Sequence, residues 1–243
     1  NYLEIEKMKK LLIITPVKDS IELTEKTIRS VMDSVNRDAF DYVVYDDFST
    51  EENACRLDDL SSELGFRVVH LRDVLNTPSP NYRSVLQMAQ QEAINDDCHL
   101  VIVESDVVVD SDTFQRLESE VRDDVGLVAA VTVDENGDVN FPYLFARKWK
   151  NRNVETKKRF SFCCTLLTNN FLKSYSFTSL DPTKNWYDVF ISHKSIELGF
   201  QNILQMTNRV VHRPHSSRPW KLLKYTNPLK YYWIKYTKGF DKI

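Results

Sequence analysis

The sequence contains little glycine, with five residues in a chain of 243. Neither G-x-G-x-x-G nor G-x-x-x-x-G-K-S/T occurs, which argues against dinucleotide-binding dehydrogenases and P-loop NTPases. No stretch reaches the roughly 18 apolar residues of a membrane-spanning helix, and no segment has the pattern of a signal peptide. With 42% hydrophobic and 28% charged residues, the composition suits one globular α/β domain, alone or with an appendage.

Cysteine is also scarce, and its spacing predicts no disulfide or zinc site. The four residues are Cys55, Cys98, Cys163 and Cys164, and none forms a C-x-x-C pair. The adjacent Cys163 and Cys164 cannot readily bridge each other. Reduced thiols are therefore expected, which favours a cytoplasmic protein.

The formal net charge of -3 is unevenly distributed. Residues 213–243 contain eight Lys or Arg and one Asp, a net charge of +7, which leaves -10 for the rest of the chain. A basic tail on an acidic body predicts an anionic partner for the tail. The acidic body argues against nucleic-acid binding. Met8 resembles a natural start, so residues 1–7 are interpreted as added or upstream sequence.

Apolar runs alternate with helical patterns through residue 133, which predicts a doubly wound, mostly parallel sheet flanked by helices. Pro16 is expected to end the first strand, and Asp19 with Glu22 resembles a capping box. The strands are expected at 11–15, 42–45, 67–71, 100–103 and 126–133, and the helices near 21–35, 50–64, 83–94 and 112–121.

The pattern is looser after Asn140. Residues 141–159 predict a long loop or irregular hairpin, where substrate contacts often lie. A strand at 162–168, a helix at 186–198 and two short strands at 202–206 and 209–212 are expected. From Trp220 onward, apolar residues at helical spacing predict one or two basic, aromatic helices, with Asn227 as a cap before Pro228. This tail could bind anionic lipid headgroups or pack on the domain or a second subunit.

Two carboxylates, Glu104 and Asp106, follow the apolar run at 100–103. In open α/β sheets, ligands bind beyond the carboxyl ends of the strands. Two acids at such an end can hold a divalent cation, since Mg²⁺ and Mn²⁺ prefer oxygen ligands. An acid-x-acid triplet is also common at solvated strand ends, so the pattern alone leaves both interpretations open.

Other candidate residues carry weaker signals. The turn from Thr15 to Asp19 would lie beside the ligand crevice, although ordinary turn chemistry also explains it. Asp47 could bind a nucleobase or ribose, or cap the following helix. Asp188 could serve as a general base, or interact with the dipole at a helix start. His212 could bind a metal or a diphosphate, although single histidines are usually structural.

The order of these segments resembles glycosyltransferase family 2, with its GT-A fold, over roughly residues 11–212. TPVKDS is similar to the P-V-Y-N-E opening of that family, and VVYDDFST to V-V-D-D-G-S-T. The triplet ESD stands where the family has D-x-D, and WYDVFISHKSIELGF is similar to E-D-x-D-L-x-x-R-x-x-x-x-G-Y. The basic aromatic segment 213–243 would follow the GT-A domain of residues 8–212, with a nucleotide-binding half at 8–133 and an acceptor half at 134–212.

The resemblance implies an inverting transfer from a nucleotide-diphosphate sugar, with a UDP-sugar favoured, to a carbohydrate or lipid-linked acceptor. Such a hexosyltransferase-type enzyme would serve polysaccharide or glycolipid synthesis, in the cytoplasm or at the inner face of the membrane. Asp188 would be the base, and Mg²⁺ or Mn²⁺ would bind Asp106, Glu104 and His212. The donor would contact residues listed here: Thr15, Pro16, Val17, Asp19, Asp47 and Glu104.

The sequence departs from the family pattern at four positions of the site, and at one of them Phe48 stands where the family has a small, flexible Gly. Glu104 replaces an Asp, Tyr187 replaces the Glu before the expected base, and Phe190 replaces a downstream acid. These departures keep open a catalytically inactive GT-A module that binds nucleotides or serves as a scaffold. A sugar nucleotidyltransferase is a weaker alternative, because TPVKDS lacks the glycine-rich loop of such enzymes. The oligomeric state stays open.

Overall fold

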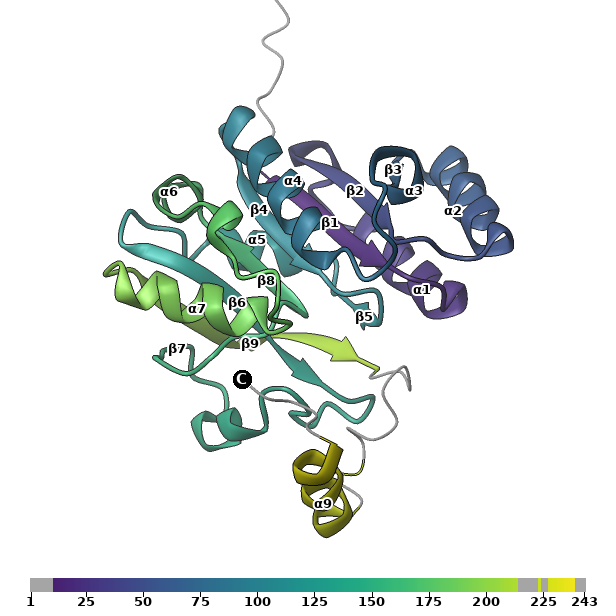
Figure 1. The fold of residues 1–243 in the computed structure, drawn as a ribbon. Helices are drawn as coiled ribbons and strands as arrows, with labels where there is room; N and C mark the ends of the chain where they lie inside the picture. Colours follow the sequence, from purple (N-terminus) through teal and green to yellow (C-terminus); the bar gives the residue numbers. More distant parts are fainter. Residues whose placement is uncertain (1–10, 214–222, 224–226, 239–243) are drawn as a thin grey trace, which may run out of the picture.

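The computed structural model describes residues 11–213, residue 223 and residues 227–238. Within this part the chain forms a mixed nine-stranded sheet with helices on both faces (Figure 1). The strands are β1 (Leu11–Val17), β2 (Phe40–Asp46), β3 (Arg67–His70), β4 (His99–Val103), β5 (Val107–Val108), β6 (Val125–Val133), β7 (Val154–Glu155), β8 (Cys164–Leu167) and β9 (Gln201–His212).

The described helices alternate with these strands. They are α1 (Ile21–Met32), α2 (Glu51–Leu64), α3 (Leu71–Val74), α4 (Tyr82–Asn95), α5 (Thr113–Glu118), α6 (Asn169–Ser174), α7 (Tyr187–Glu197) and α9 (Pro228–Lys238), with 3-10 helices η1 (Arg37–Ala39), η2 (Leu144–Trp149) and η3 (Phe177–Ser179). Helix α2 has a cap at each end: Thr50 Oγ1 accepts a hydrogen bond from Asn53 N, and Gly65 has a φ of 75°.

The strand order is β3-β2-β1-β4-β8-β6-β9-β5, with β7 paired to β9. The strands β3, β2, β1, β4, β6 and β9 run in one direction, whereas β8, β5 and β7 run against them. The predicted doubly wound, mostly parallel sheet is therefore confirmed. The antiparallel β8 joins the β3–β4 half to the β6–β9 half, and the sequence pattern did not indicate this direction.

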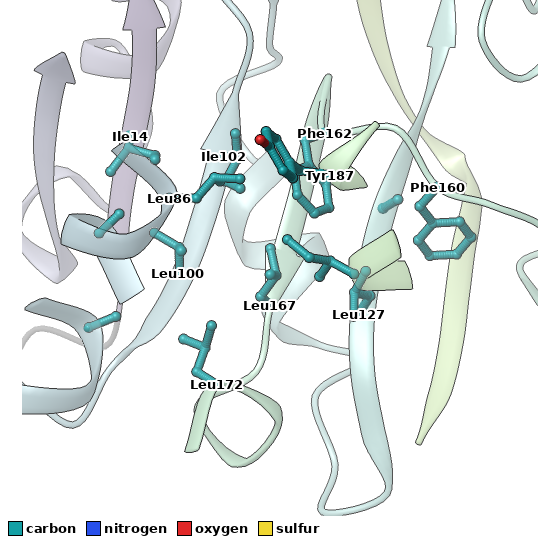
Figure 2. Packing of buried hydrophobic residues seen from close by; sticks show 14 of the residues in the cluster. Ile14, Leu86, Leu100, Ile102, Leu127, Phe160, Phe162, Leu167, Leu172 and Tyr187 are labelled. Atoms are coloured by element: carbon teal, nitrogen blue, oxygen red, sulfur yellow. The ribbon is translucent and has the colours of Figure 1, made fainter. Parts of the chain in front are cut away.

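Alternate residues of each buried strand point to opposite faces of the sheet. Leu12 and Ile14 belong to a core cluster shared with α4, α6 and α7, while Leu11 and Ile13 belong to one shared with α1, α2 and α5. Figure 2 shows the first cluster, in which Leu86 from α4 lies over the sheet. Since the central strands are covered on both faces, polar groups at their carboxyl ends are held on a rigid support.

The expected end of the first strand and the expected cap of the first helix were wrong. Pro16 does not end the first strand, because it stays in register with Tyr45 of β2. Strand β1 pairs with β4 only as far as Ile14. Proline, which has no N–H, is tolerated at position 16 because β1 has no hydrogen-bonded partner among the described strands on that side there. The capping box is also absent: Ser20 occupies the N-cap of α1 without a side-chain hydrogen bond.

The two short strands expected near the end of the domain are one strand, β9, with a register shift against β6. The polar residues that interrupt the apolar pattern are buried and bonded to α5. Gln205 Nε2 donates to Arg116 O at 2.6 Å, and Asn208 Nδ2 donates to Thr113 O at 3.1 Å. Their side chains satisfy helix carbonyls, and the strand therefore continues through a polar stretch.

The tail is described only in part. Residues 1–7 and most of the segment between Pro214 and Asn227 lie outside the described residues. The expected cap is confirmed, because Asn227 Oδ1 accepts a hydrogen bond from Lys230 N at 3.1 Å. No helix among the described residues combines the length and apolar character needed to cross a membrane.

Candidate active site

A tight turn at the carboxyl end of β4 holds the two acids of the ESD triplet. Glu104 N donates to Cys163 O at 2.9 Å, and Val107 N donates back to Glu104 O at 3.2 Å. The turn leads directly into β5, so Asp106 is fixed between two paired strands. Its side chain is buried, with 8% of the residue exposed. Both acids lie at the carboxyl edge of the parallel strands, as the sequence predicts.

The end of β9 brings His212 to this turn. The antiparallel pairing of β5 with β9 sets Val107 opposite His212, and Arg213 N donates to Asp106 O at 2.9 Å. The Nε2 atom of His212 then lies 3.6 Å from Oδ2 of Asp106. The chain thus places two residues 106 positions apart side by side, and these are two of the three predicted metal ligands.

The ring of His212 has a fixed orientation. Its Nδ1 donates to Phe141 O at 2.7 Å, so in the neutral tautomer the lone pair is on Nε2, which faces the carboxylate. Burial lowers the pKa of His212, but the Asp106 carboxylate, the Glu104 charge and the Phe141 carbonyl outweigh burial and raise it overall. A carbonyl that orients the ring is the usual arrangement behind a metal-binding histidine.

Cys163 completes the cluster, and the sequence analysis did not assign it to the site. Its Sγ lies 3.1 Å from Glu104 Oε2 and 3.4 Å from Ser161 Oγ. Burial, followed by the Glu104 charge, raises the pKa of Cys163 well above its usual value. The group is therefore a neutral thiol that donates to Glu104 and orients its carboxylate.

These donors fit a divalent cation. One ligand atom each from Glu104, Cys163 and His212 can lie within 4.8 Å of the others. Two atoms bound to one cation at about 2.1 Å are roughly 3 to 3.5 Å apart, close to the 3.6 Å between His212 Nε2 and Asp106 Oδ2. Carboxylates with one imidazole suit Mn²⁺ or Mg²⁺, and Cys163, as a protonated thiol, supports Glu104.

The carboxyl end of β2 supplies a second pair of acids with separate roles. Asp46 is fully buried, and its two oxygens contact Ser49 N at 3.0 Å and His70 Nδ1 at 2.8 Å. Asp47 is half-buried and accepts three hydrogen bonds at 2.8 Å, one from Ser79 Oγ and two from Asn81. Asp47 therefore holds the loop before α4 against the predicted nucleoside side of the site.

The first strand-to-helix turn is tied to the same region. Asp19 Oδ1 accepts from Thr50 N at 2.8 Å and Asn53 Nδ2 at 3.1 Å, and the Thr50 bond is the main reason that its pKa is lowered. The Thr15 side chain lies inside the core, where its Oγ1 accepts from Tyr42 OH at 2.9 Å. Val17 is also buried, and Pro16 is partly exposed at the edge of the sheet.

Asp188 and Tyr82 interact electrostatically with each other, and Tyr82 also interacts with Glu104 of the ESD turn. Asp188 belongs to the first turn of α7, and its Oδ1 accepts from Val189 N at 2.9 Å. The sequence analysis missed Tyr82, the first residue of α4. Burial raises the pKa of the Tyr82 phenol well above normal, and the charges of Glu104 and Asp188 raise it further. Its hydroxyl is therefore near both carboxylates, and it has no hydrogen-bond partner among the described residues.

A pocket of about 400 Å³ is lined by His193 of α7 and by Phe145, Lys157, Lys158 and Arg159. Neither lysine nor the arginine forms an ion pair with another described residue. The ring of Phe145 lies 6.0 Å from the ring of Tyr143. Burial is the main reason that the pKa of Tyr143 is raised, and the electrostatic effects of Cys163 and, more weakly, Asp188 raise it further. A pocket with three such cations suits an anionic group.

A comparison with protein families identifies the family of this chain. The model of Glycosyl transferase family 2 matches residues 12–177. The chain belongs to glycosyl transferase family 2.

Solved structures with similar folds are also glycosyltransferases. For S. aureus TarS 1-349 in complex with UDP-GlcNAc, the TM-score is 0.65 at 15% identity over 89% of this chain and 65% of that chain. For the mannosyltransferase PcManGT from Pyrobaculum calidifontis with GDP-Man and Mn²⁺, it is 0.63 at 17% identity over 92% and 63%. For GalNAc-T7 with UDP, GalNAc and Mn²⁺, it is 0.63 at 14% identity over 85% and 44%.

This family 2 chain therefore spans between 44% and 65% of the length of those three chains. At sequence identities of 14% to 17%, the structural similarity to these proteins establishes the fold alone. The comparison with curated proteins gives no match. The family assignment ends at residue 177, so Asp188 and His212 lie beyond the matched segment.

Proposed function

We propose that this family 2 chain transfers a sugar from a nucleotide-diphosphate sugar to an acceptor hydroxyl, with inversion at the anomeric carbon. The observation that carries the proposal is the cluster of Asp106, His212 and Glu104 at the end of β4, together with Tyr82, whose pKa is raised by burial and further by the charges of both Glu104 and Asp188. Of the donors, a UDP-sugar is favoured, because two structures of similar fold contain UDP or UDP-GlcNAc.

The donor diphosphate would lie at the carboxyl edge of β4, beside Asp106, His212 and Glu104. These residues would hold Mg²⁺ or Mn²⁺, which when bound neutralises charge on the leaving diphosphate. The nucleoside would extend toward the end of β2, where the Asp47 bonds fix the loop to Asn81. Pro16, Val17 and Asp19 belong to the neighbouring turn.

The acceptor would enter beside the first turn of α7. Asp188 would take the proton from the acceptor hydroxyl, whose oxygen then forms a bond to the anomeric carbon. The bond from that carbon to the diphosphate breaks from the opposite face, and its electron pair leaves with the diphosphate. The Tyr82 hydroxyl could donate to a sugar or diphosphate oxygen between the two carboxylates, since it has no partner among the described residues.

The cationic pocket lined by Lys157, Lys158 and Arg159 favours an acceptor that carries an anionic group, as phosphate-containing polysaccharides and lipid-linked sugars do. All four cysteines are free, which favours a reducing, cytoplasmic environment.

The test begins with calorimetric titration of the full chain with UDP and with GDP, each with and without Mn²⁺. Wild type is expected to bind UDP more tightly with Mn²⁺, and Asp106→Asn should lose this dependence. The matched control Asp59→Asn changes an exposed acid on α2 and should bind as wild type does. Failure of wild type to bind either nucleotide would contradict the proposal.

The second step measures UDP release from UDP-sugars. Asp188→Asn is expected to slow release by on the order of a hundredfold or more while it keeps UDP binding. Equal loss of binding and turnover would remove Asp188 from the role of base. If wild type bound UDP but released none from any donor, with or without acceptors, an inactive nucleotide-binding module would replace the proposed enzyme.

A further inference from the structure

Helix α9 carries an exposed apolar surface. Four of its residues are largely open to solvent: Leu229 at 86%, Tyr232 at 48%, Trp233 at 63% and Tyr236 at 80%. The other exposed large apolar residues of the described chain, Val35, Val74 and Leu198, are on separate elements. Single exposed apolar residues are ordinary, whereas a group on one element indicates an interaction surface.

The four residues form one continuous stripe. Their spacing is i, i+3, i+4 and i+7, which places them on a single face of a helix. Tyr231 lies about 150° around the helix from the centre of the stripe, and it is buried, with 5% exposed. The helix therefore has one buried side, which carries Tyr231, and the stripe is on the opposite, exposed side. In Figure 1, α9 lies at the lower edge of the molecule.

The sequence of the helix and of the segment around it is basic. Lys230 is exposed beside it, the helix sequence also contains Lys235 and Lys238, and residues 213–243 carry a net charge of +7. Trp and Tyr prefer the boundary between headgroups and acyl chains, and lysine keeps its charge in water while its stem lies on apolar surface. Aromatic and basic residues together are typical of helices that lie in the plane of an anionic membrane surface.

We propose that α9 binds an anionic lipid surface, with Leu229, Tyr232, Trp233 and Tyr236 inserted at the acyl boundary. The charge distribution favours lipid over a symmetric dimer through this face, because such a dimer would bring together two helices whose sequences each contain three lysines and no acid. The body carries -10, so an anionic bilayer repels it and attracts the tail, which fixes the orientation. The inference does not depend on the transfer reaction.

Flotation of the full chain with vesicles tests this inference. Phosphatidylcholine vesicles with phosphatidylglycerol should bind wild type at least about tenfold more tightly than phosphatidylcholine alone. The variant Leu229→Ser/Trp233→Ser/Tyr236→Ser should bind the anionic vesicles on the order of tenfold more weakly or worse, because it loses the inserted apolar surface. The control Val35→Ser/Val74→Ser removes exposed apolar residues elsewhere and should bind as wild type does.

A melting curve and UDP binding measured on each variant show whether the domain stays folded. Equal vesicle binding by wild type and the stripe variant would overturn the inference, since the basic charge alone would then explain binding. Absence of wild-type binding to anionic vesicles would also overturn it. Light scattering measures the oligomeric state of wild type and of the stripe variant. If wild type is an oligomer, the stripe variant is a monomer and neither binds vesicles, the stripe contacts a second copy of the chain instead of lipid.

Discussion

The substitution Gly126→Ala tests how closely β6 approaches the end of α7. A Cβ atom at Gly126 would lie 2.1 Å from Ser195 Oγ and 2.8 Å from Phe200 Cβ. Neither neighbour can easily move, because Ser195 Oγ donates to Asn202 Oδ1 at 2.7 Å and Phe200 N donates to Ser195 O at 3.0 Å. Glycine is needed here for space, as its φ is not in the left-handed region.

The expected loss of stability follows from these contacts. Overpacking of a buried site costs about 1 to 3 kcal/mol, and disruption of the buried Ser195–Asn202 hydrogen bond costs about 1 kcal/mol more. The lower backbone entropy of alanine in the unfolded chain offsets about 0.4 to 1 kcal/mol. We therefore expect Gly126→Ala to lower the free energy of unfolding by about 1 to 3.5 kcal/mol.

Urea denaturation of Gly126→Ala, Ser195→Ala and the double variant measures the contribution of each contact. Removal of the Ser195 hydroxyl relieves the 2.1 Å contact but leaves the 2.8 Å contact with Phe200. The double variant should therefore be at least about 1 kcal/mol more stable than additivity predicts. A Gly126→Ala protein within about 0.5 kcal/mol of wild type would refute the close approach.

Two further predictions concern titration and the site. Burial lowers the pKa of His70, but the hydrogen bonds to Asp46 and Asp58 outweigh burial and raise the pKa overall. The protonated ring therefore stabilises the fold fully below the pKa of the unfolded state, and this stabilisation is lost as the pH rises through the pKa of the folded state. The difference in unfolding free energy between wild type and His70→Gln should thus shrink from pH 6 to pH 8, and urea titrations that show a constant or growing difference would contradict this. Tyr82→Phe removes a buried hydroxyl without a partner among the described residues, so it should be neutral or up to about 1 kcal/mol stabilising. The same variant should slow UDP release from UDP-sugars by about tenfold, and full activity would exclude a role for the hydroxyl.

The strands and helices around β1, β2 and β4 were predictable because local signals agree with burial. Thr50 and Gly65 bound α2 as their residue types indicate. The errors have tertiary causes. Gln205 and Asn208 interrupt an apolar pattern, yet they stay in β9 because α5 offers carbonyls to both.

The site was partly predictable for the same reason. Acids after parallel strands must meet at one edge, so Glu104 and Asp106 could be identified from the sequence. Cys163 and Tyr82 could not be found in this way, because their positions depend on elements whose placement has no local signal. Cys163 reaches Glu104 only because β8 runs antiparallel to β4. Tyr82 interacts with the charge of Glu104 only because of how α4 packs.

His212 ends β9, and the chain continues from it without a further described strand to α9. The covalent chain between His212 and Pro228 can span at most about 55 Å. If α9 docks on a bilayer, this connection tethers the site within that distance of the surface. Acceptors confined to the same surface would then meet the site at a raised effective concentration. An acceptor free in solution would gain nothing from the tether, so lipid-linked and soluble acceptors would differ in rate without any difference in contacts at Asp188.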